Sequence, residues 1–163
     1  MADNLGVTGP DWLERVLGWG ALAILAGLVA AVVRGAGHWG EAPWIVWAHM
    51  ATIAPALALT PVMLWRRRGD ARHRLMGWIW VSLMAVTAVM TLGIRQVNHG
   101  GFSYIHLLTL VTLVSLVTIV RSARGHNVVR HRRTVRGLVI GAMLLAGFFT
   151  FPFGRMLGMW LLG

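Results

Sequence analysis

Long apolar segments, separated by short arginine-rich segments, restrict the fold of this chain more than any other feature. Stretches of about 18 or more apolar residues are typical of transmembrane helices, because roughly 20 residues at ~1.5 Å rise cross a ~30 Å hydrocarbon core. The chain has 163 residues, of which 57% are hydrophobic and only 12% are charged. A soluble domain of this length would contain fewer apolar residues. The sequence therefore predicts an all-α integral membrane protein.

The apolar segments predict five spans within a single transmembrane domain that covers residues 1–163. These spans cover approximately residues 16–33, 43–65, 75–94, 102–120 and 137–153. Basic segments at 66–74 and 121–136 join the second span to the third and the fourth to the fifth. A histidine, a basic segment and a His-Arg pair occur in the same order in both halves. We therefore expect spans two to five to form a four-helix bundle with pseudo-two-fold symmetry about the membrane normal.

The positive charge predicts how the chain lies in the membrane. All 15 basic residues are arginines, and the two basic segments hold five and six of them. Short arginine-rich loops stay cytoplasmic, which predicts a cytoplasmic N-terminus, an external C-terminus and a bacterial inner-membrane location. Residues 1–15 lack the positive region of a secretory signal, so the first apolar segment is interpreted as a true span. A net charge of +10 would indicate nucleic acid in a soluble protein, but here the expected partner is the lipid bilayer.

Tryptophans near the ends of the predicted spans are consistent with this placement. Trp and Tyr gather at both membrane interfaces, where an apolar ring with a polar edge is most stable. The residues expected at the outer interface are Trp39, Trp44 and Trp47, and those expected at the inner interface are Trp65, Trp78 and Trp80.

Four histidines are the candidate functional residues. His49 and His106 lie near the outer ends of the second and fourth spans, and His73 and His131 lie at the inner ends of the third and fifth. Neutral imidazoles at matching depth on facing helices can ligate one haem iron, and helix bundles commonly hold such sites. The pattern predicts a haem b or metal site at His49 and His106, and a second cofactor-binding pair at His73 and His131. Hydrogen bonds between helices, or contacts with headgroups, are the alternative.

Other chemistry has little support in the sequence. Because the chain has no cysteine, disulfides, thiolate metal sites and c-type haem attachment are excluded. No Ser-His-Asp set, phosphate loop or carboxylate pair indicates a hydrolase or a kinase, and whether the protein is an enzyme is left open. A Zn or Cu site in which His38 and His99 join the outer pair is a further option; otherwise these residues and His126 are interpreted as loop histidines.

Two segments together resemble a bacterial family of membrane proteins. They are WAHMATIAPALALTPVMLWRRRGDARHRLMGWIW and SYIHLLTLVTLVSLVTIVRSARGHNVVRHRRTVRG. Each contains an intramembrane His, a basic segment and a His-Arg pair, as do the proteins grouped as domain of unknown function 2306. The resemblance covers about residues 44–155, including Arg155, and departs at Thr134, where an apolar residue is expected. That family implies a membrane fold and no particular activity.

The order of the histidines is also similar to that in the transmembrane di-haem cytochromes b that use ascorbate. In those proteins helices two and four hold one haem, and helices three and five hold the other. This resemblance implies haem at His49 with His106 and at His73 with His131, although the present chain has one helix fewer.

The sequence thus predicts a haem b-binding protein that carries electrons between quinol and a partner. Two alternatives stay open. The first is a non-catalytic accessory or assembly subunit of a respiratory or photosynthetic membrane complex. The second is a carrier of a divalent metal or a small molecule.

Overall fold

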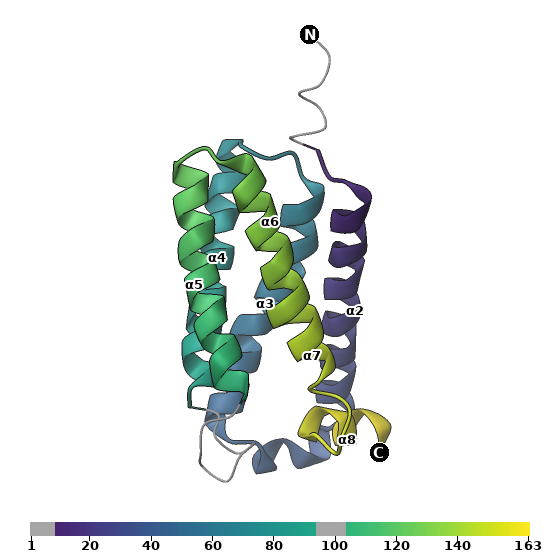
Figure 1. Ribbon diagram of the computed structural model, residues 1–163. Coiled ribbons are helices and arrows are strands. Elements are labelled where there is room, and N and C mark those ends of the chain that lie inside the picture. The colour runs from purple at the N-terminus through teal and green to yellow at the C-terminus, as the bar shows by residue number, and fades with distance from the viewer. Residues whose placement is uncertain (1–8, 94–103) are drawn as a thin grey trace.

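The protein folds into long helices that run between two ends (Figure 1). This computed structural model describes residues 9–93 and 104–163. Four helices are long and apolar enough to cross a membrane: α2 (Trp12–Arg34), α3 (Trp44–Trp65), α4 (Ala71–Thr91) and α5 (Tyr104–Arg124). A fifth helical stretch comprises α6 (Val128–Leu138), the π-helix η3 (Val139–Leu145) and α7 (Ala146–Phe148). Within the described residues there is no strand, so the protein is an all-α, multi-pass membrane protein.

Polar side chains begin the helices at one end of the molecule. Asp11 and Glu14 form a capping box at the start of α2, and Asp70 accepts a hydrogen bond from the backbone N–H of His73 in α4. Asn127 accepts from the backbone N–H of Arg130 in the same way. Each cap satisfies a backbone donor that has no partner within the helix. The turns α3–α4 and α5–α6 and the start of α2 lie together here (Figure 1), and we call this the basic end.

The opposite end, called the far end, carries two short elements. The 3-10 helix η1 (Ala36–Glu41) connects α2 to α3, and α8 (Met156–Leu162) packs against α2 at the C-terminus. Trp47 lies between Trp39 and Trp160, with ring centroids 5.5 and 6.1 Å apart. Trp19 and Trp65 pair towards the basic end, with centroids 5.3 Å apart. The rings therefore gather at both ends, as expected of a membrane protein.

Trp80 is an exception to the predicted interfacial belt. Its side chain is only 4% exposed, and its indole N–H donates to the Thr60 hydroxyl at 2.9 Å. Trp80 lies nine residues inside α4, in the core and away from either interface. The sequence predicted an interfacial position for Trp80 because it shows how close this residue is to the basic segment but not which way its side chain points.

The helices form a ring in which each packs on the next. α2 contacts α3, α3 contacts α4, α4 contacts α5, α5 contacts α6, and η3 returns to α2. The predicted four-helix bundle with α2 outside it therefore becomes a five-membered arrangement; the predicted symmetry between its halves stays a prediction. All five stretches supply core residues, including Leu17, Leu57, Met84, Ile119 and Met143.

The helices extend further into the basic segments than the sequence predicted. α4 begins at Ala71, α5 continues to Arg124 and α6 begins at Val128. Most of the segment 121–136, predicted to be a loop, is therefore helical. The Asn127 cap starts α6 early, and arginine is a good helix former.

Candidate functional site

A cavity of about 820 Å³ lies among the helices in the half of the protein nearer the far end. Ligand sites typically have volumes of roughly 300–1,000 Å³ and mostly apolar walls with a few placed polar groups. Every long helix and the segment after α7 contribute to this wall. The polar side chains on it are His49, Thr87, Thr91, Thr109, Thr112, Thr150 and Arg155. The cavity therefore fits an apolar ligand that makes a few polar contacts.

His49 contacts one hydroxyl group of the neighbouring helix α4 at this wall. Its Nδ1 lies 3.4 Å from the Thr91 hydroxyl oxygen. The single hydroxyl proton of Thr91 is donated to the Thr87 carbonyl at 2.9 Å. With that proton used, the hydroxyl oxygen of Thr91 can accept from His49 in the tautomer that carries the proton on Nδ1. This tautomer leaves the lone pair on Nε2, as required of a metal-ligating histidine.

A second pair of threonines joins the same helices. The Thr87 hydroxyl donates to the Thr52 hydroxyl at 2.7 Å, and the Thr52 hydroxyl donates to the backbone carbonyl of His49 at 3.0 Å. The first bond connects α4 to α3, and the second lies within α3 at the backbone of His49. In an apolar environment such bonds fix helix rotation, so the orientation of His49 is set by packing between two helices.

His106 is placed differently from its predicted partner. Its side chain is 8% exposed, which agrees with the expectation that it does not face lipid. Its neighbours Leu108 and Thr109 line the cavity, but His106, although within the described residues, is not part of the wall. The structure therefore does not bring both rings of the outer pair to one cavity. Matching depth on two helices did not determine the direction in which each ring points.

The inner pair lies together at the basic end. His73 and His131 are close enough for their charges to interact, and both side chains are half-buried. The Nδ1 of His131 is 3.1 Å from the carbonyl oxygen of Ile119 in α5, to which it donates. Neither residue lines the cavity, nor a second hollow between α5 and α6. The two histidines lie in the same region, but neither hollow offers room for a porphyrin between them.

Glu14 forms a buried ion cluster beside the inner histidines. The Glu14 side chain is 1% exposed and contacts three guanidinium groups. Arg132 is at 2.9 Å and Arg136 at 3.1 Å, and Arg68 is also ion-paired with Glu14. Asp11 pairs with Arg132 at 3.3 Å and with Arg136. Because α2, the α3–α4 turn and α6 all contribute, this cluster joins three parts of the basic end.

Asp11 lies just outside the first span and is ionised within this cluster. Partial burial acts to raise the pKa of its carboxyl. The hydrogen bond from the backbone of Glu14 and the interaction with Arg136 outweigh that effect, so the pKa lies below its ordinary value. The sequence predicted that the first span begins at about residue 16, which left Asp11 and Glu14 outside it. The structure instead places Glu14 in the first turn of α2, where it balances part of the arginine charge.

The remaining histidines do not join these sites. His38 is exposed in η1, His126 is exposed in the α5–α6 turn, and His99 lies outside the described residues. Among the residues that the structure describes, no group of three or more His, Asp or Glu side chains is arranged to hold a metal ion. A divalent-metal site built from His49 and His106 therefore has no third protein ligand of these kinds there.

Sequence reasoning missed the threonines that hold His49 and gave Arg155 no role. Thr87 and Thr91 are four residues apart in an apolar helix, and this spacing places both side chains on one face. That pattern was available as a signal. The sequence did not show which residues pack against that face, because it does not give the rotation of α4 relative to α3.

Comparisons with known proteins add no relative. The chain matches no protein-family model, no curated protein and no solved structure. The resemblances described above therefore stay predictions, and the functional argument depends on the site itself.

Proposed function

We propose that this membrane protein binds one haem b in the cavity, that His49 would hold its iron, and that the protein carries electrons within the membrane. One observation supports the proposal more than any other. The imidazole lies on the wall of a cavity large enough for a ligand, and its Nδ1 is already occupied by Thr91. A neutral imidazole held in this way is the usual proximal ligand of haem.

The rest of the cavity wall fits the same group. A porphyrin has a wide apolar face, and the wall consists mainly of Ile, Leu, Val, Met, Ala and Phe side chains. Haem b also carries two carboxylates. Arg155, at the far end of the cavity and with no ion-paired carboxylate among the described residues, would hold one of them through a charge-assisted hydrogen bond.

Each part of the protein would have a separate task in this proposal. When bound, haem supplies one-electron redox chemistry, while the protein sets its position and surroundings. His49 binds and orients the group, Thr91 keeps the imidazole proton on Nδ1, and the apolar wall keeps water away. The predicted second haem at His73 and His131 is not part of the proposal, because neither the cavity nor the hollow between α5 and α6, both in the described part of the chain, is lined by that pair.

The optical spectrum of the purified protein tests the proposal. The protein would be expressed with an adequate haem supply, purified in mild detergent and measured before and after reduction with dithionite. We expect a Soret band, and a sharp α-band that appears on reduction. A featureless visible spectrum would contradict the proposal. It would favour the alternative hypothesis that the protein is an accessory or assembly subunit of a membrane complex.

Thr91→Val should weaken haem binding without removing the ligand. Valine has nearly the same shape but cannot accept the proton on Nδ1 of His49. Loss of such a supporting hydrogen bond typically reduces affinity by roughly 10- to 100-fold, and we expect a loss near the lower limit. Haem titration into the apoprotein measures this change. Thr118→Val on α5 is the control, since that hydroxyl bonds to its own helix at Val114 and lies outside the cavity; an equal loss there would contradict the role of Thr91.

We also propose that the basic end faces the cytoplasm of a bacterial inner membrane. Both arginine-rich segments and the start of α2 lie at one end, and the C-terminal α8 lies at the other (Figure 1). Short arginine-rich segments are retained on the cytoplasmic side. Alkaline phosphatase fused after Gly163 should therefore be active outside, and a green fluorescent protein fused there should be dark. The reverse result would invert the orientation.

A further inference from the structure

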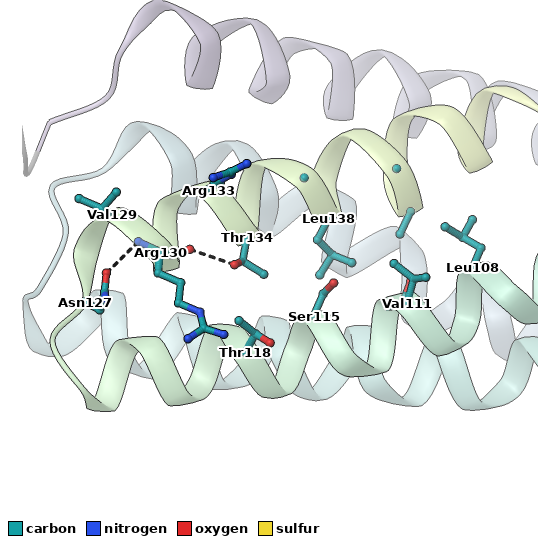
Figure 2. A pocket seen from close by; sticks show the side chains of 14 residues that line it. Leu108, Val111, Ser115, Thr118, Asn127, Val129, Arg130, Arg133, Thr134 and Leu138 are labelled. Carbon is teal, nitrogen blue, oxygen red and sulfur yellow. Dashed lines mark hydrogen bonds between the residues drawn. The ribbon is translucent and has the colours of Figure 1, made fainter.

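A second hollow lies between α5 and the α6–η3 stretch and adjoins the cavity, with which it shares Leu108, Thr112, Gly141 and Ala142. Its volume is about 950 Å³. The α5 wall extends from Leu108 to Thr118, or about 15 Å at ~1.5 Å per residue. We call this hollow the α5–α6 groove (Figure 2). It begins at the basic end and continues towards the middle of the predicted membrane.

Two arginines stand at the basic end of this groove. Arg130 and Arg133 both line it, and both are exposed. The side chain of Arg130 lies between α6 and α5, directed towards Thr118 (Figure 2). Among the described residues, no carboxylate is ion-paired with either guanidinium, whereas Arg132 and Arg136 on another face of α6 hold Glu14 and Asp11. One face of α6 is thus neutralised within the protein, and the groove face keeps its positive charge.

Beyond the arginines, the groove is lined in part by glycines, and the hydroxyl groups of two threonines there already have hydrogen-bond partners. Gly137 and Gly141 line it, and a Cβ atom added at either position would meet nothing within 4 Å. The hydroxyls of Thr118 and Thr134 donate to the carbonyls of their own helices, at Val114 and Arg130. These hydroxyls are satisfied without a ligand. The hollow therefore combines a cationic entrance at the interface with an open channel along the helices.

We propose that the α5–α6 groove binds an anionic phospholipid, with its phosphate at Arg130 and Arg133 and one acyl chain along Gly137 and Gly141. Charge complementarity selects the headgroup, because a guanidinium fork matches phosphate oxygens. The position of the groove favours a lipid over a free anion, because the groove continues from the interface into the apolar layer of the membrane. Basic pockets between helices at the cytoplasmic surface are the usual location of such lipids. This inference does not depend on the haem proposal.

Native mass spectrometry of the delipidated full-length protein tests the inference. Phosphatidylglycerol and phosphatidylcholine with the same acyl chains would be added separately. We expect phosphatidylglycerol to bind the wild-type protein at least about 10-fold more tightly, because each arginine near the surface adds a favourable interaction with anionic lipid. Excess inorganic phosphate should not displace it, since phosphate cannot occupy the acyl channel.

Matched variants separate the groove from the general positive charge. Arg130→Gln with Arg133→Gln should remove the preference for phosphatidylglycerol. Arg67→Gln in the α3–α4 turn with Arg72→Gln in the first turn of α4 removes the same charge at exposed positions and should keep the preference for phosphatidylglycerol. Gly137→Leu should fill the channel and reduce lipid binding about 10-fold or more with every arginine present; Gly137 lines the groove but not the cavity that contains His49.

Three outcomes would overturn the inference. The first is equal loss of binding in both double variants, which would indicate unspecific attraction to the basic end. The second is displacement of the lipid by inorganic phosphate alone. The third is a dimer, detected by light scattering, that Gly137→Leu dissociates; the groove would then be occupied by a helix of a second copy.

Discussion

Replacing His49 with Ala is expected to abolish haem binding while the helices remain folded and inserted. His49 is the one predicted ligand on the cavity wall, and its Nδ1 is already engaged by Thr91. Without an axial imidazole, haem would keep only apolar contacts and the contact with Arg155. We expect the haem content of the purified variant to fall at least about 10-fold, since loss of a supporting group alone costs that much. Absorbance of the Soret band relative to protein measures it.

His106→Ala is the matched comparison for this experiment. His106 is buried but does not line the cavity, so we expect this variant to retain most of its haem. Added imidazole should also restore haem binding to His49→Ala, because a free ligand can enter the space left by the ring. Loss of haem in both variants would instead indicate ligation of one iron by both histidines.

Glu14→Gln is expected to cause the largest loss of stability of any single polar substitution at the basic end. The substitution keeps the size of the side chain but leaves Arg68, Arg132 and Arg136 with Asp11 as the remaining acid of the cluster. Removing one partner from a buried ion cluster costs about 3 kcal/mol, because the remaining charges stay away from water without compensation. Thermal unfolding in detergent should show a midpoint lower by about 10 °C.

Asp70→Asn is the control for that prediction. Asp70 pairs with Arg66 at 3.6 Å, and both side chains are substantially exposed. An exposed pair contributes less than about 1 kcal/mol, and asparagine caps a helix as well as aspartate does. The midpoint should therefore change little. If Glu14→Gln is no more destabilising than Asp70→Asn, the cluster does not join α2 to the basic end as we infer.

The positions of the long helices could be predicted from the sequence because they depend on local composition. α3 occupies Trp44–Trp65, against a predicted 43–65, since Pro43 and the first arginine of the α3–α4 turn mark its ends. The second basic segment was harder to assign. Its charge indicated a loop, while the cap at Asn127 and the helix propensity of arginine make most of it helical.

The candidate site could be predicted only in part, because it depends on how the helices are rotated. The sequence located His49 and His106 near the same ends of their spans, and both positions agree with the structure. It did not determine which ring faces the cavity, because that follows from contacts such as those of Thr52 and Thr91 with neighbouring helices. Glu14 illustrates the same limit. The pattern Asp-x-x-Glu identifies a capping box, but its arginine partners Arg132 and Arg136 are more than a hundred residues away in the chain.

The decisive measurement is the ratio of haem b to protein chain. It is measured by the pyridine haemochrome absorbance of the purified protein together with amino-acid analysis of the same sample. We expect a ratio close to one, because His49 is the histidine on the cavity wall. A ratio near zero after purification with sufficient haem would contradict haem binding, and a ratio near two would contradict the proposal of a single haem and would favour a second group at His73 and His131.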